Sequence, residues 1–370
     1  MHVQRVAMAG VRVESWTVLG DDDRPVEPIE RFLAYLTDVE RSPNTVKAYA
    51  HDLKDYWVFL TVRALDWREV RLEDVAEFVG WLRLPPAGRS RAVTVLPSVQ
   101  AHVGASTINR KVAALAAFYA HHARHGVDLG ELLTTWRLPG RRGGWKPLLH
   151  HITKGVPQRQ RMVAVKAAKK LPRILTAVEV QSILDACEHL RDRFLFALLW
   201  DSGVRIGEAL GMRHDDLEAA DRTVTVRPRL NDNGARSKSV EQRSIPVSQQ
   251  LIRLWGDYLH LEYGSIDSDY LFVNLFAEPR GQAWSYAAVY DLVLRLRVRT
   301  GIDFDPHWFR HSMATKALRD GVPIEVVSEL LGHASVITTM SVYGHLTAQD
   351  SRRALEAAGW FTASGSEVTL

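Results

Sequence analysis

The sequence of 370 residues holds one cysteine, Cys187, which excludes a disulfide bond within it and a cysteine-rich zinc site. No apolar run approaches the roughly 18 residues that a membrane-spanning helix needs, and the N-terminus lacks the basic and then apolar layout of a secretory signal. We therefore expect a cytoplasmic protein with no membrane contact. The composition, 46% hydrophobic and 24% charged, is typical of globular proteins, and the length suits two domains.

Acidic residues are absent between positions 137 and 173, where eleven lysines and arginines occur. Because the whole chain carries +4, the remaining residues must sum to −7. A basic strip inside a mildly acidic protein is typical of a segment that binds a polyanion. A solvated surface loop has the same composition, so that reading stays open. We expect residues 126–171 to be a basic connector between two domains.

A cluster of carboxylates for magnesium and a thiol pair for zinc are also lacking around the most reactive side chains of the sequence. That set comprises Arg205, Lys238, His307, Arg310, His333 and Tyr343. Guanidiniums match phosphate oxygens, and imidazoles transfer protons near neutral pH. A tyrosine becomes a nucleophile when a base or a positive field assists its ionisation. The set predicts phosphoryl transfer to a protein hydroxyl with no metal and no other cofactor.

The order and spacing of this set resemble the tyrosine recombinases, also called the phage integrase family. The local sequences at 203–210, 307–312 and 331–335 carry the resemblance, which extends over about residues 28–358. One such segment is a weak signal, whereas all of them in family order are specific. The resemblance implies a site-specific recombinase that cuts and rejoins double-stranded DNA through a 3′-phosphotyrosyl intermediate. It also implies a homotetramer on DNA, a monomer or weak oligomer when free, and association with the nucleoid.

The family pattern assigns a role to each residue of the set. Arg205 and Arg310 would hold the scissile phosphate, with a further hydrogen bond from His333. His307 would assist deprotonation of Tyr343, the nucleophile. Glu208 resembles an acidic residue of the family that supports the site. Lys238, in a predicted hairpin, would be the general acid.

Lys238 is placed by its surroundings in the sequence. It lies between two β-branched segments that predict strands, at 223–226 and 244–247, and five residues before Arg243. In the family a hairpin lysine stands in this relation to the following strand. Most hairpin lysines are only solvated, so the role of Lys238 depends on the resemblance.

The fold expected from the resemblance has two domains. Residues 28–125 show helical apolar spacing and look like the all-α, SAM-like core-binding domain. Residues 172–370 look like the mainly α, α+β catalytic domain with a small antiparallel sheet and a C-terminal tail helix at 347–358. Residues 1–27 form an N-terminal arm of unknown role. Expected DNA contacts lie on early helix turns and in the connector: Thr45, Lys47, Asn109, Arg110, Lys111, Arg141 and Arg142.

Three other functions share part of this pattern. A type IB topoisomerase has a similar residue set, but the helical N-terminal region and short chain favour a recombinase. A catalytically silent DNA-binding paralogue would not need the complete set, and a metal-dependent nuclease would need carboxylates. The histidines at 121, 122 and 125, and the pair His307 and His311, lack matching ligands at metal spacing. The long connector and hairpin look like those of transposon-borne members.

Overall fold

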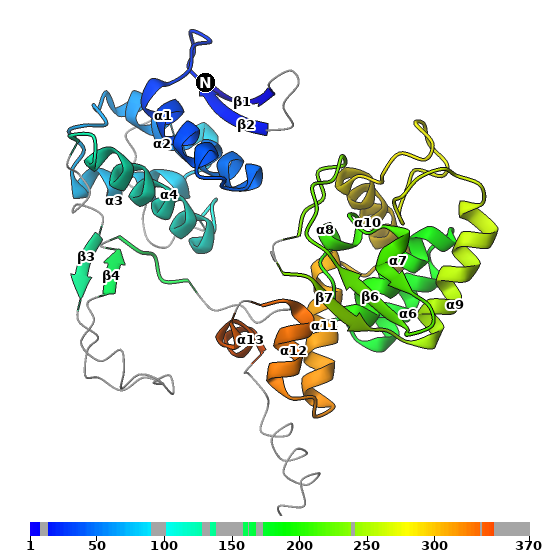
Figure 1. Ribbon diagram of the computed structural model, residues 1–370. Coiled ribbons are helices and arrows are strands. Elements are labelled where there is room, and N and C mark those ends of the chain that lie inside the picture. The colour runs from blue at the N-terminus through cyan, green and yellow to red at the C-terminus, as the bar shows by residue number, and fades with distance from the viewer. Residues whose placement is uncertain are drawn as a thin grey trace, which may run out of the picture. The chain divides into compact units, whose positions relative to one another are not determined.

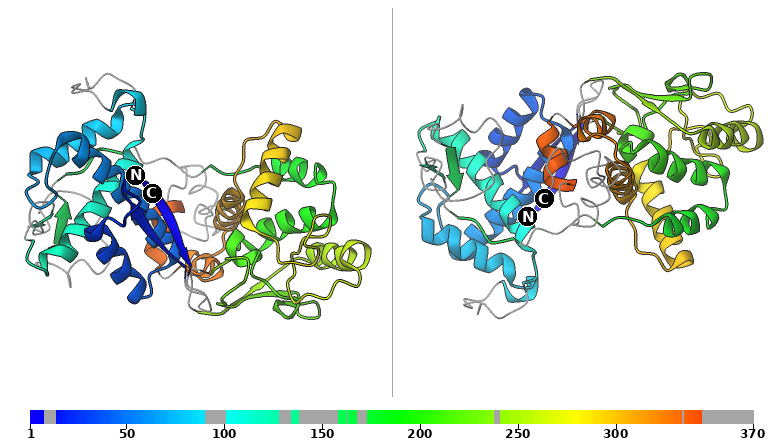
Figure 2. Two further views of the ribbon diagram at one scale, coloured as in Figure 1. Left: turned by 90° about the horizontal axis from the view of Figure 1, so that it is seen from above. Right: turned by 90° about the horizontal axis from the view of Figure 1, so that it is seen from below.

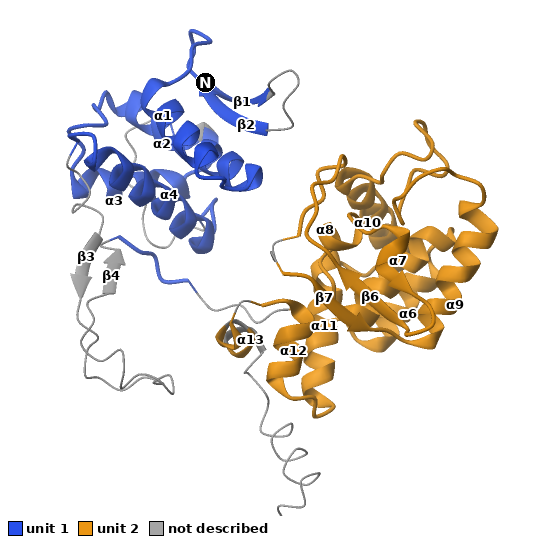
Figure 3. Cartoon of the chain, in the orientation of Figure 1, with its two compact units in different colours: residues 1–169 blue, residues 170–370 orange. Residues whose placement is uncertain are grey.

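The computed structural model describes residues 1–7, 14–89, 101–127, 134–137, 158–161, 163–167, 173–237, 241–333 and 335–343. The chain divides into two compact units, residues 1–169 and 170–370 (Figure 3). Figure 1 labels the helices and strands of each unit, and Figure 2 shows them from two further sides. Within the described ranges, no helix combines the length and the apolar character needed to cross a bilayer.

The N-terminal unit is mainly helical, as expected for 28–125. Its helices are α1 (Glu27–Asp38), α2 (Pro43–Arg63), α3 (Leu72–Arg83) and α4 (Ala105–Ala123), with a short 3-10 turn η1 (Pro86–Gly88). Ser42 caps α2 by accepting a hydrogen bond from the Thr45 N–H, and Pro43 occupies the first turn. The apolar faces of the helices meet in one core, where Phe59 and Phe118 are fully buried.

The described residues 1–7 and 14–27 belong to this unit. Strands β1 (His2–Ala7) and β2 (Glu14–Leu19) pair antiparallel, and β2 packs against α1 and α2 (Figure 1). Val18 of β2 is fully buried in the helical core. The all-α expectation did not include this hairpin, because alternation in the sequence is weak there. Burial of Val18 against the helices stabilises this strand, although the alternation of its sequence is weak.

Part of the basic connector is also fixed to the N-terminal unit. Strands β3 (Thr134–Arg137) and β4 (Gln158–Arg161) form a second antiparallel pair. Val163 and Val165 then pack against the helical core. The side-chain amide of Asn109 on α4 both donates to the Val165 carbonyl and accepts from the Val165 N–H, each at 2.8 Å. The unit boundary therefore falls after this segment.

The C-terminal unit surrounds a small three-stranded antiparallel sheet in the order β5-β6-β7, which confirms the expected α+β class. The strands are β5 (Leu217–Glu218), β6 (Thr223–Val226) and β7 (Arg243–Pro246). The helices are α6 (Ala177–Asp185), α7 (Leu190–Ser202), α8 (Ile206–Ala209), α9 (Gln249–Tyr258), α10 (Tyr286–Thr300), α11 (Pro306–Arg319), α12 (Ile324–Leu331) and α13 (Val336–Tyr343), with turns η2 (His214–Asp216) and η3 (Leu259–Tyr263).

Helix α7 is the centre of this unit. Its segment 194–200 is apolar on all sides, and the helix packs against both α9 and α11. Gly203 ends it in the left-handed conformation, with φ of +65°, and a Cβ there would lie 2.9 Å from Cε of Met313. The chain can therefore turn sharply at Gly203, and Arg205 follows two residues later. The predicted buried helix at 194–200 is confirmed.

Candidate functional site

Arg205 is held at the start of α8 by a buried carboxylate. Its backbone N–H donates to Oε2 of Glu208 at 2.9 Å, and its Nη1 donates to Oε1 at 2.8 Å. The Glu208 side chain is fully buried, whereas that of Arg205 is 20% exposed. The Glu208 carboxylate thus fixes the Arg205 guanidinium, and part of the side chain remains accessible to solvent.

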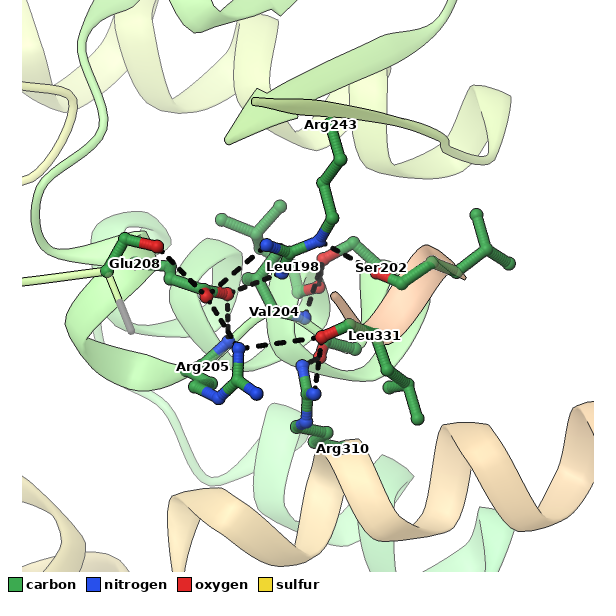
Figure 4. Close-up of polar contacts among 11 residues, drawn as sticks. Leu198, Ser202, Val204, Arg205, Glu208, Arg243, Arg310 and Leu331 are labelled. Atoms are coloured by element: carbon green, nitrogen blue, oxygen red, sulfur yellow. Dashed lines mark hydrogen bonds and ion pairs between the residues drawn. The ribbon is translucent and has the colours of Figure 1, made fainter. Parts of the chain in front are cut away.

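Arg310, on α11, meets Arg205 at the C-terminal end of α12. Its Nη1 donates to the Gly203 carbonyl at 2.8 Å and its Nη2 to the Leu331 carbonyl at 2.5 Å. Nη1 of Arg205 reaches the same Leu331 oxygen at 3.5 Å (Figure 4). The last carbonyls of a helix have no partner within the helix and carry its negative end. They therefore orient two guanidiniums that are about a hundred positions apart in the sequence.

Arg243 completes this cluster, although it is not among the site residues predicted from the sequence. Its Nη2 lies 2.6 Å from Oε2 of Glu208, and its Nε donates to the Leu330 carbonyl at 2.9 Å (Figure 4). Its side chain is only 8% exposed. The strand period offered a signal, because Arg243 lies on the same face of β7 as the buried Ile245.

Glu208 remains ionised in spite of its burial. Burial opposes ionisation, but the hydrogen bond and charge of Arg243, aided by Arg205, hold the pKa of this carboxyl below its usual value. The charges of Glu208, Arg205, Arg243 and Arg310 then sum to +2. The cluster is a fixed positive centre suited to a phosphodiester.

His333 projects from the end of α12 directly beside the arginines. Gly332 takes the left-handed conformation that ends the helix, and Nδ1 of His333 then lies 2.8 Å from Oγ1 of the buried Thr339 on α13. Burial, followed by the charges of Arg310 and Arg205, lowers the pKa of His333 to about 4. The imidazole is therefore neutral at pH 7 and can donate one hydrogen bond to an anion.

His307 lies in the first turn of α11, where Asp305 caps the helix by accepting its N–H at 2.8 Å. His307 is exposed, and its ring centroid lies 4.4 Å from that of His311. Burial, and then the charges of His307 and Arg310, lower the pKa of His311 to about 4. Among the residues the structure describes, no group of three or more His, Cys, Asp or Glu side chains is arranged to hold a metal ion.

For two further residues of the predicted set, Tyr343 and Lys238, the structure describes the neighbouring residues but not the side chains. Tyr343 is the last residue of α13, which packs against α12, but its side chain lies outside the described residues. Lys238 also lies outside them. The residue before it, Ser237, donates its hydroxyl to Oε1 of Glu208 at 3.4 Å. The structure thus brings Arg205, Arg310 and His333 together, whereas for Lys238 and the Tyr343 side chain it describes only neighbouring residues.

The expected DNA contacts on α4 differ in their surroundings. Lys111 is a correction to the expectation, because its side chain is 8% exposed and its Nζ lies 2.9 Å from Asp52 and 2.8 Å from Asp55. Arg110 is half exposed and also pairs with Asp52. Asn109 is occupied with Val165. Lys111 therefore serves as a cation of the interior.

The expected contacts on α2 remain at the surface. Nζ of Lys47 lies 4.5 Å from the centre of the Trp16 ring, and Lys47 is exposed. The hydroxyl of Thr45 lies 2.8 Å from that of Ser42 in the first turn of the helix. Arg141 and Arg142 fall outside the described residues.

Comparison with known proteins shows which family the chain resembles. Residues 173–350 match the model of the phage integrase family, and residues 29–126 match that of the phage integrase N-terminal SAM-like domain. Transposase A from transposon Tn554 of Staphylococcus aureus is 35% identical over 354 residues, which are 95% of this chain and 96% of that protein.

Solved structures of other recombinases share the fold. The Tn1549 transposon integrase in complex with a circular intermediate DNA has a TM-score of 0.62 at 16% identity, covering 90% of this chain and 99% of that one. A lambda integrase tetramer bound to a Holliday junction has a TM-score of 0.53 at 16% identity, covering 84% and 77%.

The chain therefore belongs to the phage integrase family, the tyrosine recombinases. It is a site-specific recombinase that cuts and rejoins DNA strands. Neither the topoisomerase nor the silent DNA-binding paralogue is favoured by these relatives.

Proposed function

We propose that this recombinase cleaves DNA by attack of the Tyr343 phenol on the scissile phosphate. Arg205 and Arg310 bind the non-bridging oxygens, and His333 donates a further hydrogen bond. The observation that supports these roles is the convergence of the three side chains at the end of α12, where fixed donors cost no reorganisation during the reaction.

Two proton transfers accompany the attack. The bond from phosphorus to the Tyr343 oxygen forms as the phenol proton passes to His307. The bond from phosphorus to the 5′-oxygen breaks, and that oxygen takes a proton from Lys238. The phosphotyrosyl bond retains the energy of the phosphodiester, so neither ATP nor a metal is part of the scheme. A 5′-hydroxyl from a second duplex reverses the step and completes strand exchange.

The N-terminal unit and the connector would hold the duplex on either side of this site. Thr45 and Lys47 at the start of α2, with Arg110 on α4, contribute contacts to phosphates, and Arg141 and Arg142 add contacts from the connector. Asn109 is assigned a positioning role through Val165, and Lys111 a structural one. Several such ion pairs would make affinity fall steeply with salt.

The active assembly would be a homotetramer on DNA, formed from monomers or weak oligomers. The neighbour described as a lambda integrase tetramer on a Holliday junction supports this assembly. The resemblance to a Tn554 transposase along nearly the whole chain supports a role in transposition, inside the cytoplasm. Its DNA site would then lie at the ends of a mobile element.

Covalent trapping on a nicked suicide substrate tests the proposal. The wild-type protein should form an adduct that survives SDS, with or without EDTA, and Tyr343→Phe should form none while still binding DNA. Tyr290→Phe, at an exposed tyrosine of α10, is the matched control and should trap normally. An adduct formed by Tyr343→Phe would overturn the choice of nucleophile.

A further inference from the structure

Ser237 and Arg243, which flank Lys238 in the sequence, both contact the same buried carboxylate. On one side, the Ser237 hydroxyl donates to Oε1 of Glu208 at 3.4 Å. On the other, Arg243 approaches Oε2 at 2.6 Å and Oε1 at 3.4 Å. Glu208 also fixes Arg205 at 2.8 Å. One carboxylate therefore connects the two residues that flank Lys238 to Arg205, the proposed phosphate ligand.

Arg243 extends this connection to a third element. Its Nε donates to the Leu330 carbonyl at 2.9 Å, one residue before the carbonyl that receives Arg310 and Arg205 (Figure 4). A Cβ at Gly332 would lie 2.7 Å from Nη1 of Arg243, so the guanidinium fills the space beside the turn that presents His333. Strand β7, helix α8 and the end of α12 are thus joined by one side chain.

We propose that Arg243, through its pair with Glu208, is a positioning residue for the general acid. It holds the loop of Lys238 in register with Arg205, Arg310 and His333. The inference rests on the proposed function, in which Lys238 protonates the leaving oxygen. Arg243 itself does not touch the substrate.

The chemistry of the side chain explains why an arginine stands here. Its planar fork donates to the carboxylate and to the Leu330 carbonyl at the same time, which a lysine ammonium cannot do with the same rigidity. Both side chains are buried, at 8% and 0% exposure, so solvent does not loosen the pair. A misplacement of about 1 Å in a reacting group can slow a reaction about 10²-fold.

A sulfur substitution separates acid catalysis from the other steps. In normal DNA the 5′-oxygen leaves with the electron pair of its bond to phosphorus and needs a proton. When sulfur replaces that oxygen, the leaving group departs as a thiolate, because thiols ionise near about pH 8.5. Loss or displacement of the acid then has little effect, whereas loss of a phosphate ligand still does.

The experiment compares cleavage rates of the full chain on suicide substrates with oxygen or sulfur at the bridging 5′ position. Arg243→Gln should cleave the oxygen substrate about 10²-fold more slowly than wild type and the sulfur substrate within about fivefold of it. Arg243→Lys retains the positive charge and serves as a second variant if Arg243→Gln does not fold. It should show the same pattern with about a tenfold loss. DNA binding and thermal melting monitor the fold.

Two further variants identify the cause. Lys238→Ala should also be restored by sulfur. Arg191→Gln removes another buried arginine of this unit, equally exposed at 8% and paired with Asp192, and should slow both substrates equally or not at all. If Arg243→Gln and Arg243→Lys are equally slow on both substrates, the positioning role is wrong. Restoration of Arg191→Gln by sulfur would also overturn it.

The two proposals fail in different ways. If sulfur restores Arg243→Gln but not Lys238→Ala, the pair positions an acid and Lys238 is not that acid. If sulfur restores Lys238→Ala but not the Arg243 variants, the acid assignment stands and the positioning inference falls.

Discussion

Two buried carboxylates of this recombinase, Asp52 in the N-terminal unit and Glu208 in the C-terminal unit, each lie among cations, and the two clusters serve different ends. In the N-terminal unit, Asp52 is 1% exposed and receives both Lys111 and Arg110. In the C-terminal unit, Glu208 receives both Arg205 and Arg243. By local geometry alone, both are buried ion-pair networks.

The difference lies in the charge that remains. Asp52, Asp55, Arg110 and Lys111 sum to zero, and the partly exposed Lys54, 3.3 Å from Asp55, adds one positive charge at the edge of this cluster. The cluster stabilises the contact between α2 and α4. In the other unit, Arg310 is oriented by backbone carbonyls, which position a guanidinium without cancelling its charge. The sum there is +2. Excess positive charge held in a fixed geometry suits a phosphodiester, whereas in the N-terminal cluster both carboxylates are matched by cations.

The largest effect should come from the arginine that carries this excess. Arg310→Gln should reduce the cleavage rate at least about 10²- to 10³-fold, because the transition state loses a fixed donor. Sulfur at the bridging position should not restore it, and rapid-quench trapping measures both rates. A restored rate would move Arg310 from phosphate binding to the leaving-group side.

Neutralising the two carboxylates tests the comparison directly. Glu208→Gln and Asp52→Asn should each lower the free energy of unfolding by about 3–5 kcal/mol, since buried cations lose their partner. Only Glu208→Gln should also slow cleavage of bound DNA, by about 10²-fold. Urea unfolding and single-turnover trapping measure the two quantities. Equal slowing by Asp52→Asn would mean that the clusters do not differ in function.

Two lysines of the N-terminal unit should separate stability from affinity. Lys111→Met should lower the free energy of unfolding by about 3 kcal/mol, because Asp52 is left buried with less compensation. Lys47→Met should instead reduce the slope of log affinity against log salt by about one, with little change in stability. Anisotropy titrations over a salt series provide the slope. The reverse result would return Lys111 to the DNA interface.

The smallest effect concerns protons. With folded-state pKa values of about 4, His333 and His311 stay neutral in the native protein, while the unfolded chain titrates near 6.5. Stability should therefore fall as pH drops from about 6.5 toward 4, and His311→Asn should reduce that dependence by about one proton. Bound DNA should raise the pKa of His333, because a phosphate favours imidazolium. Histidine NMR with and without DNA measures the shift.

Much of the fold and site followed from local patterns. The cap at Ser42, the buried helix at 194–200 and the two strands flanking Lys238 were predicted because each depends on neighbouring residues only. The hairpin at 1–19 and the role of Lys111 were not, because both depend on what α2 presents to them. A lysine on an early helix turn has the same sequence pattern whether it faces solvent or a buried aspartate.

The sequence by itself determined the chemistry: the identity and order of the cationic set, and with them the family. Only the tertiary structure decided which cations are neutralised and which remain charged, because partners such as Leu331 and Arg310, or Glu208 and Arg243, are separated by tens of residues. The sequence does not show which side chains will donate to the backbone carbonyls at the end of a helix. Folding brings them to the guanidiniums, and that contact distinguishes the proposed reactive centre from a structural ion pair.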